Sequence, residues 1–292
     1  MYEFYMPKKI YSNLESINKL ILIYEKIKSI EDDEIMFNFS SVTWISGEMI
    51  SLFGAITYKL SKRKKIFIKG LSTNIETIFQ GNTFSSMIEN MKQGKSKDSS
   101  IKFKFFKEEL TNGQMSCFEK YLTQELKPKI NLSENEINYI GSYLSEIFIN
   151  ARTHGNTFEI FCCGQKYPKL RKMRFMIVDL GVGIPHNVKK IKDLNDIGCI
   201  LWSIKKGNTT KDLDKDSGGL GLDSVLDFVN KHNGNLSIIS HNGQYNYKEN
   251  ICNNSQIYFD GTIVYIDFDY TMINDVDDLF KIIKKDNIQW NF

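Results

Sequence analysis

The stretch SEIFINARTHGNT, residues 145–157, constrains the fold more than any other part of this chain. Its composition is typical of a helix, and Glu146, Asn150 and His154 follow one another along it at intervals of four. Residues four apart lie on the same face of a helix, so these three form a polar stripe between apolar residues. Because a buried polar group needs a partner, the stripe predicts a helix that faces protein, water or a ligand.

The patterns on either side of this helix indicate an α/β (α+β) protein with domains at residues 1–108 and 109–292. The helix is expected to begin at a capping box formed by Ser133 and Glu136 and to end near Gly155. Further strands are expected at residues 2–6, 34–45, 65–71, 158–163, 173–179, 235–240 and 261–269. Further helices are expected at residues 12–29, 47–63, 73–82, 195–206 and 220–232.

Charge and cysteine content narrow the class of function. The 38 basic side chains nearly balance the 35 acidic ones, so nothing attracts the whole chain to nucleic acid or anionic membranes. No apolar run approaches the ~18 residues needed to cross a bilayer, and we expect a cytoplasmic protein without a membrane partner. Five cysteines without a CxxC pair do not favour a disulfide framework or a zinc site. Cys162 and Cys163 are adjacent in a strand pattern and are expected on opposite faces.

The segment DLGVGIP, residues 179–185, carries a second group of candidate residues. Asp179 ends an apolar strand, and its carboxylate needs a donor such as the amino group of a nucleobase. Gly181 and Gly183 would let a planar ring lie against the backbone. The alternative is a strand-ending turn with a capped aspartate.

The segment SGGLGLDS, residues 217–224, opens a helix with glycines after a long polar stretch. Backbone N–H groups at such a helix start can approach an anion closely, and the helix dipole favours negative charge there. A dinucleotide-binding turn is excluded, because Ser224 stands where the third glycine belongs and no strand precedes the segment. Gly94-Lys95-Ser96 also lacks the first glycine and the strand of a phosphate loop, so we predict an ordinary loop at residues 91–100.

The polar stripe has a chemistry that fits an anion nearby. Asn150 offers an amide oxygen, a ligand type that Mg²⁺ accepts and usually shares with phosphates. Glu146, one turn earlier, could orient or deprotonate a water. The alternative is a helix with a polar edge and no ligand.

Taken in order, ExxxNAxxHG, DxGxGIP and GGLGL resemble the N, G1 and G2 boxes of the GHKL ATP-binding superfamily. That superfamily includes gyrase, the heat-shock-90 chaperones and the histidine kinases. The resemblance spans roughly residues 130–270 and includes a strand with Gly261-Thr262 near its end. The NAxxHG form is similar to the anti-sigma-factor serine kinases of bacteria.

The resemblance implies a Bergerat two-layer α/β sandwich that binds ATP and Mg²⁺. It implies that Asn150 binds magnesium, that Asp179 accepts the adenine amino group, and that Glu146 is the general base. For His154, a structural role at the helix end is the alternative that we favour. The segment 207–217 would form an ATP lid. The other nucleotide contacts implied are Gly181, Gly183, Ile184, Thr209, Thr210, Gly218, Gly219, Leu220, Gly221, Leu222 and Thr262.

Residues 35–80 resemble a STAS domain, the anti-sigma-antagonist fold, so we expect a STAS-like domain at the N-terminus. In that family an acidic-Ser-Ser-Gly turn opens the helix after a strand, and a serine there is phosphorylated. Here the turn is Ile45-Ser46-Gly47-Glu48, which lacks the acid and places Gly47 or Glu48 at the acceptor position. We therefore predict that Ser46 is an N-cap rather than a phosphorylation site.

Several functions fit these motifs. The first is an ATP-driven regulatory switch with slow hydrolysis, in which lid closure changes how a partner protein or second protomer is bound. The second is an anti-sigma-type serine/threonine kinase that transfers the γ-phosphoryl group to a partner. A nucleic-acid-linked ATPase is a third, although it would need a further domain after the ATP-binding one. A histidine kinase is disfavoured, because no histidine precedes the ATP-binding boxes. We expect a protein partner encoded nearby, and a homodimer is compatible with these motifs.

Overall fold

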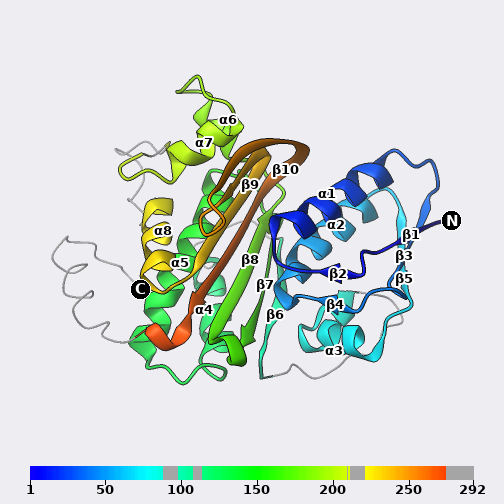
Figure 1. Ribbon diagram of the computed structural model, residues 1–292, viewed down its shortest axis with the longest axis horizontal. Helices are drawn as coiled ribbons and strands as arrows, with labels where there is room; N and C mark the ends of the chain where they lie inside the picture. Colours follow the sequence, from blue (N-terminus) through cyan, green and yellow to red (C-terminus); the bar gives the residue numbers. More distant parts are fainter. Residues whose placement is uncertain (88–97, 108–113, 209, 211–220, 274–292) are drawn as a thin grey trace.

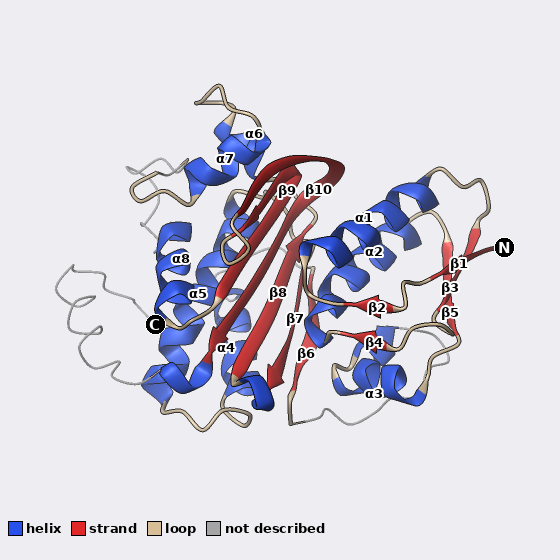
Figure 2. Cartoon of the chain, viewed as in Figure 1, coloured by secondary structure: helices blue, strands red, loops and turns tan. Residues whose placement is uncertain are grey.

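The computed structural model describes residues 1–87, 98–107, 114–208, 210 and 221–273 (Figure 1). The described residues form a mixed α/β protein with three sheets, so the predicted mixture of helices and strands is confirmed at that level (Figure 2). Within these ranges, no helix combines the length and the apolar character needed to cross a membrane. We call residues 1–87 the N-terminal unit and the described residues from 98 onward the sheet unit.

The N-terminal unit contains a three-stranded parallel sheet in the order β1-β3-β5 and a separate parallel pair, β2-β4. Helices α1 and α2 lie against one face of the three-stranded sheet (Figure 1). The strands are β1 (Tyr2–Tyr5), β2 (Lys9–Ile10), β3 (Glu34–Asn38), β4 (Trp44–Ile45) and β5 (Lys65–Lys69). The helices are α1 (Leu14–Lys28), η1 (Gly47–Met49), α2 (Ile50–Ser61), α3 (Thr73–Gly81) and η2 (Phe84–Met87).

Helix α1 forms where capping and apolar spacing agree. The Asn13 side chain accepts a hydrogen bond from the Ser16 backbone N–H at 2.9 Å, which satisfies one of the unpaired donors of the first turn. Residues that share one face of the helix are buried: Ile17, Leu20, Ile21 and Tyr24.

The single strand predicted at residues 34–45 is wrong, because the structure divides it between two sheets. The Asn38 side-chain oxygen accepts a hydrogen bond from the Ser40 backbone N–H at 2.8 Å, and the Val42 N–H donates to the Phe39 carbonyl at 2.9 Å. An asparagine that bonds to the backbone two residues on favours a turn over continued pairing. The chain therefore turns between β3 and β4.

The sheet unit is built on a five-stranded antiparallel sheet in the order β6-β7-β8-β10-β9. Its strands are β6 (Ser100–Phe106), β7 (Ile160–Tyr167), β8 (Lys172–Asp179), β9 (Asn235–Asn246) and β10 (Ile251–Asp269). Its helices are α4 (Gln114–Leu126), α5 (Glu134–Thr153), η3 (Pro168–Leu170), α6 (Ile184–Val188), α7 (Asp196–Ser203), α8 (Gly221–Lys231) and η4 (Tyr270–Met272). Strand β6 thus lies in this sheet, although it precedes the predicted boundary between residues 108 and 109.

Both faces of the five-stranded sheet are buried. On β8, Ile177 packs in the core shared with α4, α5 and α8, whereas Met176 and Val178 pack in the core shared with the N-terminal unit. Cys162 and Cys163 divide between the same two cores, which confirms their predicted placement on opposite faces. The sheet is therefore the middle layer between helices on one side and the N-terminal unit on the other (Figure 1).

Polar contacts cross the boundary between the two units. Glu48 of η1 is fully buried there; the Tyr167 hydroxyl donates to its Oε2 at 2.9 Å, and the Arg174 guanidinium lies 3.8 Å from its Oε1. Burial raises the pKa of Glu48, and the positive charge of Arg174 opposes that effect. The Ser51 hydroxyl donates to the Met176 carbonyl at 2.9 Å. These contacts fix η1 and α2 to the centre of the sheet.

Two predictions about helix starts have different outcomes. The capping box at Ser133 and Glu136 is confirmed, since the Glu136 N–H donates to the Ser133 hydroxyl at 3.3 Å and Glu136 Oε2 accepts from the Ser133 N–H at 2.6 Å. Ser46 occupies the N-cap position of η1, but its side chain makes no capping hydrogen bond.

The loop predicted at residues 91–100 lies largely outside the described residues, and its last residue already belongs to β6.

Candidate functional site

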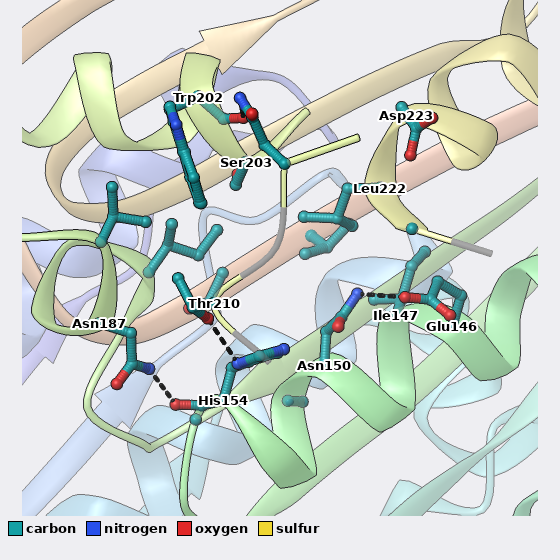
Figure 3. A pocket seen from close by; sticks show the side chains of 18 of the residues that line it. Glu146, Ile147, Asn150, His154, Asn187, Trp202, Ser203, Thr210, Leu222 and Asp223 are labelled. Carbon is teal, nitrogen blue, oxygen red and sulfur yellow. Dashed lines mark hydrogen bonds between the residues drawn. The ribbon is translucent and has the colours of Figure 1, made fainter. Parts of the chain in front are cut away.

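Three segments that lie far apart in the sequence meet at a cavity of about 480 Å³ (Figure 3). Helix α5 supplies the polar stripe, the end of β8 supplies Asp179, and the start of α8 supplies a helix N-terminus. The predicted site residues that line the cavity are Glu146, Asn150, His154, Asp179, Gly183, Ile184, Thr210, Gly221, Leu222 and Thr262.

One further predicted residue, Gly181, is described but does not line the cavity. It lies in the turn after β8. Four others, and most of the predicted lid at residues 207–217, lie outside the described residues: Thr209, Gly218, Gly219 and Leu220.

The polar stripe of α5 is internally connected. The Asn150 Nδ2 donates to Glu146 Oε1 at 2.9 Å, so the amide oxygen is the atom that Asn150 can offer to a ligand (Figure 3). Glu146 is buried to 3% exposure although it carries a carboxylate. A buried carboxylate is held in place by such a donor, which orients both side chains toward the cavity.

His154 occupies the C-cap position of α5, one turn after Asn150. Its Nδ1 lies 2.9 Å from the Thr210 hydroxyl, and its carbonyl accepts from the Asn187 side chain at 2.5 Å (Figure 3). His154 thus connects the end of α5 to Thr210 and to α6. These contacts agree with a structural role at the helix end and place its ring on the cavity wall.

Asp179 is the buried acid of the site, with 4% of its surface exposed. The Gly181 backbone N–H donates to its Oδ1 at 3.0 Å, and Thr262 also hydrogen-bonds to the carboxylate. Burial raises the pKa of Asp179 to about 7, while the hydrogen bonds from Gly181 and Thr262 act in the opposite direction. A further hydrogen-bond donor from a ligand would stabilise the ionised form of this carboxylate.

Glycine is required where the turn after β8 meets the end of α5. A β-carbon on Gly181 would lie 2.1 Å from the Gly155 carbonyl oxygen, and the Val182 N–H donates to that same oxygen at 2.9 Å. Gly183 has φ of +77°, a left-handed conformation that L side chains rarely adopt. The turn therefore lies directly against α5 and keeps Asp179 facing the cavity.

The cavity also has residues that the motifs do not predict. Several of them have polar or aromatic side chains and come from α6, α7, the segment after α7 and the start of α8: Asn187, Trp202, Ser203, Lys206, Asn208 and Asp223. Trp202 sits above Thr210 and His154 in the view of Figure 3. The α7 pattern was recognisable as a helix, but its placement over the cavity depends on tertiary packing against β9, which no local pattern encodes.

The charges around the cavity favour an anionic ligand that binds together with a cation. Among the described residues, three carboxylates line it, together with Lys206 and the N-terminus of α8, where Gly221 has φ of +80°. The helix N-terminus and Lys206 attract negative groups. Glu146 and Asp223 would repel an uncompensated polyphosphate, so an oxygen-preferring cation near Asn150 fits the donor set.

The chain was compared with models of known protein families, with curated proteins and with solved structures, and none of the three comparisons finds a match.

Proposed function

We propose that this protein binds Mg·ATP in the cavity and acts as an ATP-driven regulatory switch with slow hydrolysis. In this proposal the sheet unit is a GHKL fold and the N-terminal unit is STAS-like. The observation that carries it is the convergence of the α5 stripe, the Asp179 turn and the start of α8 on one cavity. Each segment offers a different part of what an adenine nucleotide needs.

Asp179 supports adenine recognition. Its buried carboxylate is a hydrogen-bond acceptor with a pKa raised to about 7, so an amino donor stabilises its ionised form. Guanine presents a carbonyl at the position where adenine presents its amino group, so the ionised Asp179 and that carbonyl would be two acceptors facing one another with no hydrogen bond between them. The aliphatic wall nearby suits a ring: Ile177, Ile184 and Val188.

The opposite part of the cavity supports binding of the phosphates. Gly221 opens α8 without a side chain, so phosphate oxygens can approach the first backbone N–H groups of the helix. The Asn150 amide oxygen can hold a cation beside them, because its nitrogen is engaged by Glu146. When bound, Mg²⁺ would neutralise phosphate charge and polarise the γ-phosphoryl group.

Glu146 is the residue placed to act on an attacking water. It lies one turn from Asn150 on the same helix face and lines the cavity. A carboxylate within reach of a water next to the γ-phosphate can orient it or accept its proton. Its hydrogen bond from Asn150 couples the position of this base to the position of the metal ligand.

The burial of Ser46 supports a switch over phosphorylation of the chain's own N-terminal unit. Ser46 is 1% exposed, and it lies in the N-terminal unit, which packs on the sheet face opposite α5. A nucleotide bound in the cavity would be separated from it by the sheet. A kinase reaction on a separate partner would not meet this barrier, and it is the alternative outcome of the test below.

The test is incubation of the purified protein with Mg²⁺ and γ-labelled ATP, alone and with the products of neighbouring genes. Label is followed as free phosphate and as protein-bound phosphate, and Asn150→Ala serves as the blank. Slow release of free phosphate that depends on Asn150 and Glu146 supports the switch. Label on a serine or threonine of a partner would instead support a kinase, and no Asn150-dependent turnover or binding would contradict both.

A further inference from the structure

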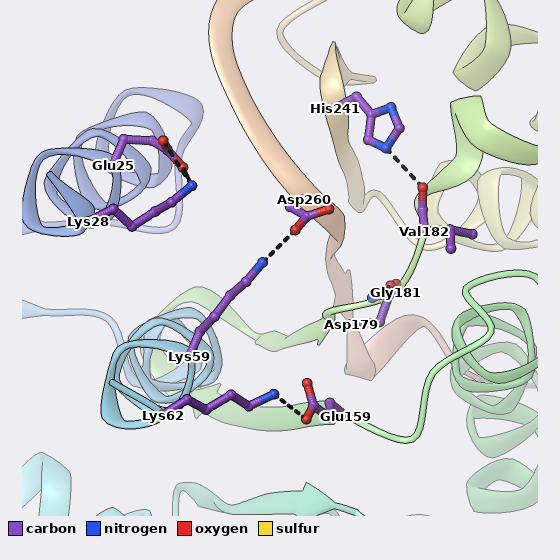
Figure 4. Close-up of polar contacts among 10 residues, drawn as sticks. All are labelled: Glu25, Lys28, Lys59, Lys62, Glu159, Asp179, Gly181, Val182, His241 and Asp260. Atoms are coloured by element: carbon purple, nitrogen blue, oxygen red, sulfur yellow. Dashed lines mark hydrogen bonds and ion pairs between the residues drawn. The ribbon is translucent and has the colours of Figure 1, made fainter. Parts of the chain in front are cut away.

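The C-terminal end of α2, in the N-terminal unit, forms two ion pairs with the sheet unit (Figure 4). The Lys59 ammonium lies 2.8 Å from Asp260 Oδ2, and the Lys62 ammonium lies 2.6 Å from Glu159 Oε1. The Tyr58 hydroxyl donates to the same Glu159 oxygen at 2.9 Å. We call Lys59–Asp260 and Lys62–Glu159 the two α2 ion pairs.

Both acids of these pairs stand next to the strand positions that flank Asp179. In the sheet, Asp179 pairs with Ile160 of β7 on one side and with Thr262 of β10 on the other. Glu159 immediately precedes Ile160, and Asp260 stands two residues before Thr262. The two α2 ion pairs therefore attach one helix to both neighbours of the buried acid.

Backbone contacts carry this attachment to the turn that forms the cavity wall. The Leu180 N–H donates to the Glu159 carbonyl at 3.1 Å. The Ser240 hydroxyl donates to the Gly261 carbonyl at 2.9 Å and accepts from the Ile184 N–H at 2.9 Å. A displacement of Glu159 or of the residues after Asp260 would thus move the backbone on either side of Asp179.

The helix end that makes these contacts is itself held firmly. The Tyr58 ring packs against Phe105 and Phe161 of the sheet, with ring centroids 4.6 and 5.5 Å apart. The Lys62 ammonium lies 4.8 Å from the centroid of the Tyr58 ring. Aromatic packing thus fixes the α2 end on β6 and β7, so the two α2 ion pairs can restrain Glu159, just before β7, and Asp260, within β10.

We propose that Lys59 and Lys62 are positioning residues that hold the base-recognition turn in its binding geometry, so that docking of the N-terminal unit sets nucleotide affinity and base selectivity. This inference rests on the proposed function. Coupling between two sites is reciprocal, so nucleotide binding strengthens the docking of α2 on the sheet to the same extent. The N-terminal unit then senses occupancy of a cavity that it does not touch.

The test compares Lys59→Gln/Lys62→Gln with Lys28→Gln. Lys28 is a matched control, because its ammonium also pairs with a carboxylate, Glu25 at 3.2 Å, and also lies over a tyrosine ring, but contacts only its own helix (Figure 4). Binding of ATP and of GTP is measured by titration calorimetry in the presence of Mg²⁺, and folding by thermal unfolding.

We expect the double variant to bind ATP roughly three- to ten-fold more weakly, which lies within the roughly two- to thirty-fold range in which residues between coupled sites act. We also expect a lower preference for ATP over GTP, whereas Lys28→Gln behaves as the wild type. Base selectivity is the discriminating readout, because a loss of stability alone lowers both affinities equally. Rescue by charge exchange, Lys62→Glu with Glu159→Lys, should restore selectivity in part.

Two outcomes overturn the inference and can be told apart. If the wild type binds ATP and the double variant matches Lys28→Gln in affinity and selectivity, the positioning role is wrong and the proposed function stands. If the wild type binds no adenine nucleotide, the proposed function is wrong and this inference falls with it.

Discussion

Asp179 should give nucleotide binding a pH dependence of defined sign. Its pKa is raised to about 7 by burial, so the carboxyl changes protonation state within the ordinary working range. An adenine amino group donates a hydrogen bond and stabilises the ionised form, so binding lowers this pKa. Affinity for ATP is therefore expected to rise with pH through the region around 7.

The magnitude follows from the ionised fraction. With a pKa of about 7, roughly 90% of the carboxyl is ionised at pH 8 and roughly 10% at pH 6. If the ionised form binds, the association constant falls about ten-fold between pH 8 and pH 6, which is about 1.4 kcal/mol.

The free energy of unfolding of the nucleotide-free protein should have the opposite pH dependence. The folded state holds a proton that the unfolded state has lost between pH 3.8 and about 7, so stability falls as pH rises through that window.

The assay is calorimetric titration with Mg·ATP at pH 6, 7 and 8, on the wild type and on Asp179→Asn. Phosphate groups of the nucleotide also titrate near this range, and the ratio of the two proteins' constants removes that contribution. Asparagine has one acceptor oxygen where Asp179 has two, and its amide nitrogen donates instead of accepting, so we expect the variant to bind weakly at every pH. A ratio that stays constant from pH 6 to pH 8, or that moves the other way, would refute the assignment of Asp179 as the base acceptor.

Three further predictions test the packing and chemistry of the site. Gly181→Ala should lower the free energy of unfolding by about 2 kcal/mol or more, because its β-carbon would lie 2.1 Å from a backbone oxygen; unchanged denaturant unfolding would contradict this. Gly141→Ala lies in α5, where the added carbon meets no described atom within 4 Å beyond the nearby backbone of its own helix, so it should instead raise stability by about 0.5–1 kcal/mol in the same assay. Glu146→Gln keeps an acceptor for Asn150 but loses the base, so hydrolysis should slow about 100-fold or more while ATP affinity changes little. Equal phosphate release by Glu146→Gln and wild type would remove Glu146 from the reaction.

The parts of the fold that sequence patterns predict are those that local chemistry decides. The Ser133–Glu136 capping box starts α5 as predicted, and the polar stripe of that helix faces a cavity. Cys162 and Cys163 lie in two different cores, because successive side chains of a strand point to opposite faces of the sheet. In these places a short-range rule and the tertiary structure agree.

The parts that were missed depend on long-range contacts or on very short elements. Strand β6 alternates Ile101 and Phe103 with Lys102 and Lys104, a signal that period-two analysis could have found, but its partner strand is about sixty residues away in the chain. Strands β2 and β4 have two residues each and carry no periodic signal. Trp202 reaches the cavity only because α7 packs on β9, which no local pattern reveals.

The architecture offers a physical route for a switch. Strand β8 ends at Asp179 in the cavity and, five residues earlier, carries Arg174 toward the buried Glu48 of the N-terminal unit. The same sheet thus has the candidate nucleotide site at one end and the packed N-terminal unit on one face. A nucleotide can change the docking of that unit only if it binds the two arrangements with different free energies.

Direct binding of nucleotide tests whether the cavity is an Mg·ATP site. Wild-type protein and Asn150→Ala are titrated with ATP and with GTP, with and without Mg²⁺, and far-UV circular dichroism checks that both are folded. We expect Mg²⁺-dependent binding of ATP by the wild type, weaker binding of GTP, and loss of the Mg²⁺-dependent affinity in folded Asn150→Ala. Absence of ATP binding by the wild type, or full Mg²⁺-dependent binding by Asn150→Ala, would contradict this expectation.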